Sequence, residues 1–130
     1  MCLKTSQNKP LIAERDITCY KVLTKDLISP CYNKQYELGK KIISNLIEDN
    51  GEVTHGLHTY IRLDTAKNDT HYYWYDQTVR CGLIVDAPIV VECLIPRGAN
   101  YYVSDSIEEY ASNQLIPIKI VYDRCEDISN

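Results

Sequence analysis

The sequence predicts a β-rich α+β fold in a single domain, made of two small packed sheets with one to three short helices. The 130 residues are enough for one core, since a chain of this length buries roughly two-thirds of its unfolded surface on folding. Branched and aromatic residues gather in short runs, which is typical of strands. Spacing that suits a helix occurs only in brief stretches.

The first half of the chain contains one clear strand. Ile17–Leu23 alternates between two faces, as strands do. Before it, residues 1–16 are polar, and we expect a loosely held arm. After it, a turn-rich loop leads to a short extended piece at Tyr36–Lys41. Lys41–Glu48 has an approximate helical stripe and is expected to form one or two helical turns.

The middle of the chain holds a turn, an ambiguous stretch and two strands. Asp-Asn-Gly at 49–51 is a strong turn signal. Asp64–Asp76 fits a helix capped by Asp64, yet its tyrosine-rich end favours a strand. Val79–Val85 and Ile89–Ile95 are separated by a short proline-containing segment, so a hairpin is a candidate arrangement.

The last part of the chain is expected to form a helix and then a strand. Ser104–Ala111 fits a short helix capped by Ser104 or Asp105. Leu115–Tyr122 is the last expected strand, and Pro117 suggests that part of it lies at an edge. The expected boundaries are 1–16 for the arm, 17–125 for the domain and 126–130 for the tail.

Charge and hydropathy restrict the partners. The net charge of −4 argues against binding to nucleic acid or to an anionic membrane surface, because both need a basic stripe. The sequence has no run of about 18 apolar residues that could cross a membrane. The first residues also lack the apolar core of a signal peptide. We therefore expect a cytoplasmic protein.

The cysteines and histidines do not predict a metal site or a disulfide framework. Six cysteines are scattered, no Cys-x-x-Cys pair occurs, and the thiols are expected to be reduced. His55 and His58 have a spacing that could serve a metal, with His71 or Cys81 completing the site. Nothing in the sequence fixes these ligands on a common face, so no metal is expected.

Glu92 is the strongest candidate for a functional residue. Strand alternation places it between Val90 and Leu94 on one face of a strongly apolar strand. A carboxylate in such a place must be partnered, protonated or used for chemistry. The structural alternative is an ion pair with one of three basic residues: Lys21, Arg80 or Arg97.

Three segments resemble the ADP-ribosyltransferase fold, in the order in which that fold has them. Glu92–Val103, ECLIPRGANYYV, is similar to the stretch that carries the catalytic glutamate there. Cys19–Leu23 resembles the early strand of the arginine-serine-glutamate class. Gly56–Tyr60 resembles its central Gly-Phe-x-Ser-Thr-Ser element.

The same segments depart from that family's pattern at key positions. Lys21 stands where the early arginine would be, and lysine cannot form the same bidentate fork. Thr59 alone is kept from the Ser-Thr-Ser element, and Val90 replaces the first acid of the Glu-x-Glu pair. The His-Tyr-Glu class also maps onto the chain, through His55, Tyr72 or Tyr73, and Glu92.

The resemblance implies a site for NAD. Glu92 would stabilise the oxocarbenium-like charge as nicotinamide leaves. Lys21 would contact phosphate, and Tyr60, Tyr72 or Tyr73 would stack on the nicotinamide. The candidate cofactor-binding residues implied in this way are Lys21, His55, His58, Tyr60, Tyr72 and Tyr73.

A second resemblance is to a family of small bacterial and phage domains with no assigned activity. These carry a Tyr-Glu-x-Gly-Lys element followed by Gly-Phe-His. Tyr36–Lys40 and Gly56–His58 are similar to the two elements at a comparable separation. The likeness spans residues 18–122 and bears mainly on the fold.

Two hypotheses of function follow, from different classes. The first is a small binding or interaction protein on a degenerate transferase-like scaffold, encoded by a phage or mobile element. Its 11 tyrosines would serve a protein partner, because tyrosine is enriched at interfaces. The second is an active NAD-dependent ADP-ribosyltransferase that uses Glu92. The missing signature residues favour the first hypothesis. The oligomeric state is left open.

Overall fold

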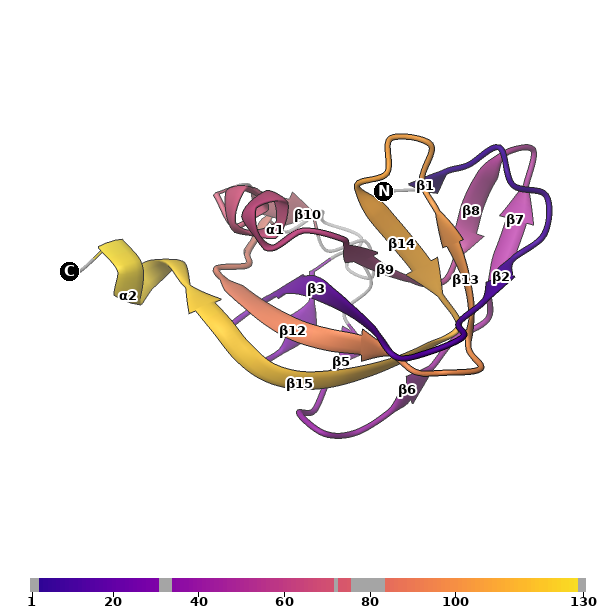
Figure 1. Cartoon of the computed structure of the whole chain (residues 1–130). Coiled ribbons are helices and arrows are strands. Elements are labelled where there is room, and N and C mark those ends of the chain that lie inside the picture. The colour runs from indigo at the N-terminus through magenta and orange to yellow at the C-terminus, as the bar shows by residue number, and fades with distance from the viewer. Residues whose placement is uncertain (1–2, 31–33, 72, 76–83, 129–130) are drawn as a thin grey trace.

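The computed structural model of the chain describes residues 3–30, 34–71, 73–75 and 84–128. Antiparallel strands dominate it, which confirms the β-rich single domain (Figure 1). The strands are β1 (Leu3–Lys4), β2 (Leu11–Ile12), β3 (Ile17–Leu23), β4 (Ile28–Ser29), β5 (Lys34–Gln35), β6 (Ile42–Ile43), β7 (Ile47–Asp49), β8 (Glu52–His55), β9 (Leu57–Tyr60), β10 (Tyr73–Tyr75), β11 (Ile84–Asp86), β12 (Ile89–Ile95), β13 (Asn100–Val103), β14 (Glu109–Ser112) and β15 (Gln114–Asp123). The helices are α1 (Leu63–Asp69) and α2 (Arg124–Ile128).

The principal sheet has eight strands in the order β2-β13-β14-β9-β3-β12-β15-β6. Only Asn113 separates β14 from β15 along the chain, yet β9, β3 and β12 lie between them in the sheet. The sheet must therefore curl until the ends of these two strands meet (Figure 1). The corner is held by backbone bonds, since the Asn113 amide donates to Asn100 and its carbonyl accepts from Ser44.

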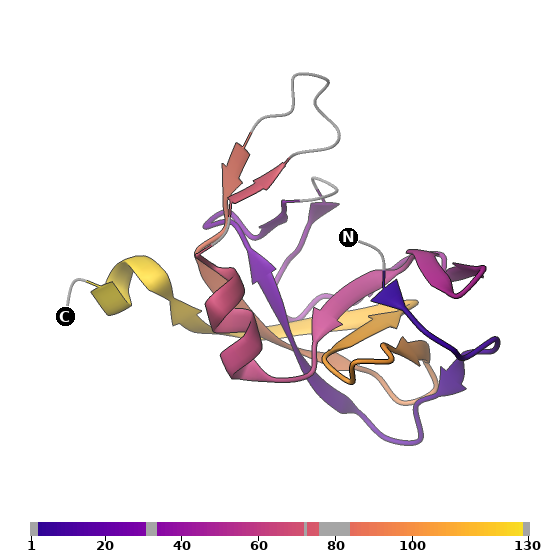
Figure 2. The same ribbon diagram turned by 90° about the horizontal axis from the view of Figure 1, so that it is seen from above.

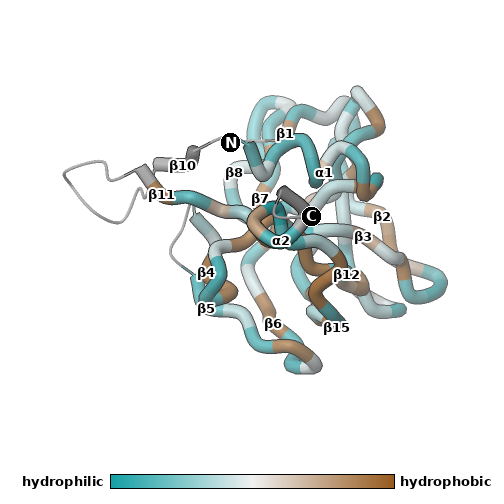
Figure 3. The backbone as a smooth tube through the Cα atoms, turned by 90° about the vertical axis from the view of Figure 1, so that its left-hand side faces the viewer, coloured by the Kyte–Doolittle hydropathy of each residue, from teal (hydrophilic) through white to brown (hydrophobic). Residues whose placement is uncertain are grey.

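The inner face of the curled sheet carries the largest core cluster. Strand alternation turns Cys19 and Leu23 of β3, and Val91 and Cys93 of β12, toward this core. All four side chains are buried, and β12 is among the most hydrophobic segments of the chain (Figure 3). The other members of the inner core are Ala13, Tyr36, Leu57, Ile89, Ile95, Ala99 and Leu115.

Two smaller units cover parts of the outer face. Helix α1 lies beside β3 (Figure 2). Its Ala66 packs with Val22 of β3 and Val90 of β12. Strands β1, β8 and β7 form a separate sheet, and its buried residues Leu3 and Val53 pack against β13 and β14. The expectation of two small packed sheets is therefore wrong, because one large sheet curls over most of the core. Hairpins β4–β5 and β10–β11 complete the strand pairs.

Several predicted elements are confirmed. Ile17–Leu23 and Ile89–Ile95 are the strands β3 and β12, and they pair along their whole length. The last predicted strand lies within β15, and beyond Leu115 no described strand pairs with its outer edge, as Pro117 suggested. The predicted turn joins β7 to β8, where Asn50 and Gly51 have positive φ values of 52° and 82°.

The helix expected at Lys41–Glu48 is wrong. This stretch forms β6 and the start of β7, and Ile42 packs on the inner core while Ile43 is exposed. Such alternation suits a strand that pairs with β15. A helix of two turns is marginal on its own, so pairing with a distant strand decides the outcome.

The helix expected at Ser104–Ala111 is also wrong, although Ser104 does cap backbone groups. Its hydroxyl accepts hydrogen bonds from the amides of Glu108 and Glu109, at 3.2 and 3.1 Å. Ile107 takes a left-handed conformation, with φ of 58°, and this turns the chain back into β14. The hydroxyl therefore stabilises a hairpin between β13 and β14.

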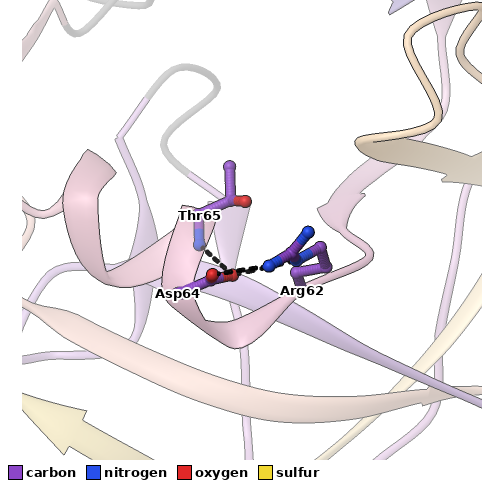
Figure 4. Close-up of polar contacts among 3 residues, drawn as sticks. All are labelled: Arg62, Asp64 and Thr65. Atoms are coloured by element: carbon purple, nitrogen blue, oxygen red, sulfur yellow. Dashed lines mark hydrogen bonds and ion pairs between the residues drawn. The ribbon is translucent and has the colours of Figure 1, made fainter.

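Residues 64–76 contain both structures that the sequence allowed. Helix α1 begins at Leu63, so Asp64 lies inside its first turn and does not cap it. The Asp64 carboxylate accepts hydrogen bonds from the Arg62 guanidinium, at 2.8 and 3.2 Å, and from the Thr65 amide (Figure 4). The Arg62 bond holds the pKa of Asp64 below its usual value. The tyrosine-rich end then forms β10.

The expected hairpin of Val79–Val85 with Ile89–Ile95 does not form in the described part. Strand β11 pairs with β10, whereas β12 pairs with β3 and β15. Residues 76–83 lie outside the described residues. The β10–β11 pair projects from the rest of the fold (Figure 2).

The expectation of a loosely held arm at residues 1–16 is not met by the described residues. Leu3 is 1% exposed and packs in the outer core, and the Thr5 amide donates to Gly51. Strands β1 and β2 pair with β8 and β13. The sequence did not reveal these strands, because the segment is polar overall and a two-residue strand is too short to show an alternating pattern. Among the described residues, no helix has the length and apolar character needed to span a membrane.

Candidate functional site

Glu92 and Lys21 lie on opposite faces of the principal sheet. Glu92 of β12 is directly opposite Tyr20 of β3, while Lys21 is opposite Val91. Directly paired residues share a face and successive residues alternate. Glu92 therefore belongs to the outer face, and Lys21 to the inner face with the core. The two residues expected to act together on NAD are not brought together.

Glu92 forms part of a row that crosses the outer face. The register gives the order Glu109, Tyr60, Tyr20, Glu92 and Lys119, one residue from each of five neighbouring strands. Glu92 is half-buried and Lys119 is exposed. Burial raises the pKa of Glu109 at the other end of the row. Of the predicted site residues, Glu92 and Tyr60 thus share a face, with Tyr20 between them.

The structural alternative for Glu92 also differs from the expectation. No ion pair within 4.0 Å involves Glu92 in the described part of the chain. Lys21 is on the other face, and Arg80 lies outside the described residues. Lys119, opposite Glu92 in the register, is the cation that the sheet aligns with it.

Lys21 is held in place at the inner face. Its ammonium group donates a hydrogen bond of 2.6 Å to the carbonyl oxygen of His58. The same Nζ atom lies 5.8 Å from the centroid of the Tyr36 ring. Tyr36 is only 3% exposed, and burial raises the pKa of its hydroxyl, which therefore stays protonated. This hydrogen bond and this aromatic face both help to position the cation.

The two predicted histidines have different environments. His58 of β9 is largely buried, and its Nδ1 atom lies 3.1 Å from the carbonyl oxygen of Gly56. Burial first, and then the charge of Lys21, lower its pKa to about 4, so the ring is neutral at neutral pH. His55 at the end of β8 is exposed, and its Nδ1 lies 3.1 Å from the Thr54 hydroxyl.

A pocket of about 430 Å³ opens beside Lys21. Leu57 and the buried Tyr36 contribute from the inner core, while the β4–β5 hairpin and the end of β8 supply polar groups. No aspartate or glutamate is among its described lining residues, although the chain has 18 acids and 14 bases. The lining residues are Lys21, Ser29, Lys34, Tyr36, Ser44, Thr54, His55, Gly56 and Leu57.

Gly56 allows the pocket wall to pack closely. A Cβ atom at this position would lie 2.9 Å from Cδ1 of Leu46 and 3.5 Å from Cγ1 of Val53. The absence of a side chain brings the junction of β8 and β9 against its neighbours. The preceding residues Thr54 and His55 also line the pocket.

The structure separates the predicted site residues into three groups. Lys21 and His55 line the pocket, and His58 supports Lys21 through its carbonyl. Glu92 and Tyr60 are on the outer face. The backbone of Tyr73 is in β10, and Tyr72 lies outside the described residues.

Sequence reasoning missed most of the pocket. Ser29, Lys34, Ser44 and Thr54 come from short strands or connections that have no pattern of their own. One signal was available, since the two segments of the second resemblance supply Tyr36 and Gly56–Leu57, which meet here. Their separate motifs did not reveal that they share one cavity.

The histidines and cysteines do not assemble into a metal centre within the described residues, where no group of three or more His, Cys, Asp or Glu side chains could hold an ion. Cys19 and Cys93 are free thiols, directly opposite each other in the inner core. Burial raises the pKa of Cys19 to about 12, which makes the thiolate nucleophile inaccessible at neutral pH.

Comparisons with known proteins give no match: no family model fits the sequence, and none is found among curated proteins or solved structures. Both resemblances described above therefore stay predictions.

Proposed function

We propose that the chain is a small binding protein and that its ligand occupies the pocket beside Lys21. The observation that carries this proposal is the meeting of apolar and polar groups in one cavity. Its volume of about 430 Å³ falls in the range of roughly 300–1,000 Å³ typical of ligand pockets. The buried residues Tyr36 and Leu57 give the lining an apolar part, and lysine, serine, threonine and histidine residues line the rest.

The geometry gives less support to the alternative function, an NAD-dependent ADP-ribosyltransferase. Such a reaction needs the catalytic acid and the phosphate-binding cation around one bound NAD. Glu92 and Lys21 are on opposite faces of the sheet, and Glu92 is not among the described pocket residues. The protein partner expected from the tyrosine content stays a prediction independent of the pocket.

The proposal is tested by blocking the pocket. A small-molecule library is screened for compounds that raise the melting temperature, and the compounds found are repeated on Thr54→Tyr, which places a ring at the pocket. A ligand at about 100 times its Kd stabilises a protein by about 3 kcal/mol, a measurable shift. We expect the stabilisation to be lost in Thr54→Tyr.

The matched control is Thr18→Tyr, the same change at an exposed position on the outer face of β3. It should keep the stabilisation. Ligands that act equally on Thr54→Tyr would contradict the pocket as the binding site. In a parallel assay with NAD, release of nicotinamide that Glu92→Gln abolishes would instead establish the transferase.

A further inference from the structure

The described polar residues of the pocket lining are basic or hydroxyl-bearing, and none of them is a carboxylate. Lys21 and Lys34 each bring an ammonium group, and His55 brings an imidazole. Ser29, Ser44 and Thr54 are on the same lining; the Ser44 hydroxyl donates to the Asn45 carbonyl, and the Thr54 hydroxyl lies 3.1 Å from His55 Nδ1. These groups donate hydrogen bonds and, in the lysines, carry positive charge.

The strand register places Ser29 and Lys34 side by side. Ser29 of β4 and Lys34 of β5 are directly paired, so both side chains leave the hairpin on one face. Lys21 approaches from β3 and is anchored by its 2.6 Å bond to the His58 carbonyl. Three separate segments therefore direct donors into one cavity, and the anchored cation loses little freedom when a ligand binds.

We infer that the pocket binds a phosphate monoester with a small aromatic or apolar body. This inference rests on the proposed function and names its ligand class. Two lysines and several hydroxyls complement a dianion with three terminal oxygens, and lysine acts on phosphate as a point charge. Tyr36 and Leu57, each 3% exposed, form the apolar part of the lining against which the body of the ligand would lie.

The alternatives fit this lining less well. A planar carboxylate carries one charge and is best matched by the fork of arginine, which is absent from the described lining. A cationic ligand would meet two ammonium groups and no described carboxylate. A neutral ligand would make no use of the positive charges that the two lysines bring to the lining.

Four probes separate these possibilities by calorimetric titration of the full chain: phenyl phosphate, benzoate, phenol and inorganic phosphate. We expect phenyl phosphate to bind most tightly, and more weakly as salt is raised. Lys34→Gln should weaken it about tenfold, because one charge-assisted hydrogen bond is removed. Lys34→Arg, which keeps the charge, should restore most of the affinity.

Lys9→Gln is the matched control, since Lys9 is exposed and not a pocket residue, and it should bind like the wild type. Lys34 is chosen because Lys21 also supports β9. Equal affinity for phenol or benzoate, or an unchanged affinity in Lys34→Gln, would overturn the inference. Failure of all four probes would overturn it too. Even if all four probes fail, library compounds that stabilise the wild type but not Thr54→Tyr would still support the pocket as a binding site.

Discussion

At the scale of single residues, burial of a neutral His58 makes stability depend on pH. Its pKa is about 4 in the folded protein, against an ordinary value of 6.5. Between these values the unfolded chain holds more protons, so the free energy of unfolding falls as pH is lowered from 6.5 to 4. The contribution lost is about 3 kcal/mol at most. Urea denaturation at pH 7 and pH 4.5 measures it.

His58→Gln isolates this contribution, because glutamine does not titrate. The variant should lose less stability than the wild type over the same pH interval. Glu109 and Asp69 have raised pKa values and act in the opposite direction, but they are common to both proteins. An equal loss in variant and wild type would show that His58 is not the group responsible.

Gly56 is the second residue with a specific structural demand. Gly56→Ala places a Cβ atom 2.9 Å from Leu46 and requires an alanine at a φ of 155°. We expect a loss of about 1–3 kcal/mol, from steric overlap together with backbone strain. Chemical denaturation measures the change.

Gly98→Ala is the control, because its φ of 89° carries the backbone strain while no atom lies within 4 Å. It should lose only about 1 kcal/mol, the strain alone. If both variants lose the same amount, close packing at Gly56 contributes nothing.

At the scale of elements, the β13–β14 hairpin depends on one hydroxyl. Ser104 is 6% exposed and accepts bonds from the Glu108 and Glu109 amides. Ser104→Ala leaves these amides without that acceptor and should cost about 1–2 kcal/mol, measured by urea denaturation. Within the described residues, the nearby Ser106 hydroxyl bonds to the Ser104 hydroxyl, at 3.0 Å, and to no backbone amide. Ser106→Ala should therefore cost less, and the reverse order would contradict this role.

The same hairpin shows which elements could be predicted from the sequence. The strands β3 and β12 were predictable because each alternates over seven residues. Ser104 was recognised as a capping residue, but the left-handed Ile107 that redirects the chain left no signal in the sequence. At Ile42–Ile43, pairing with β15 overrode a helical spacing. The conformation of such short elements is decided by their pairing with distant strands and not by their own sequence pattern.

The candidate site was predictable to a similar extent. Lys21 and His55 were identified as candidates and line the pocket. Their neighbours Ser29, Lys34 and Thr54 are residue types common on any protein surface. They come together only through the tertiary structure, which the sequence pattern does not show. The sequence also suggested that Lys21 and Glu92 share one site, and the structure places them on opposite faces of the sheet. Neither residue alone shows which face of its strand will be buried.

At the scale of the whole molecule, β15 offers an edge for association. Beyond Leu115 no described strand covers its outer side, and Ile118 and Ile120 are 38% and 46% exposed. The exposed Lys119 lies between them and Pro117 precedes them, two features that discourage edge-to-edge pairing. Lys119→Ile removes the charge and should promote dimers or larger species as concentration rises.

Size-exclusion chromatography with light scattering over a range of concentrations checks this. Lys9→Ile makes the same change at an exposed residue of the segment between β1 and β2, and should associate no more than the wild type. Equal association of both variants would mean that added hydrophobicity, and not the edge, is responsible.

The corner at Asn113 has a consequence for the time course of folding. Strands β14 and β15 are joined there by a single residue but pair with different strands, β9 and β12. Strand β3 in turn pairs with β12, which the chain reaches more than seventy positions later (Ile17 pairs with Ile95). Folding is slow in such a topology, because the entropy of closing these long loops is lost before the contacts between distant strands form. During synthesis, the curled sheet cannot close until β15, near the end of the described chain, has left the ribosome. Until then the apolar inner faces of the earlier strands lack the partners that bury them in the folded protein.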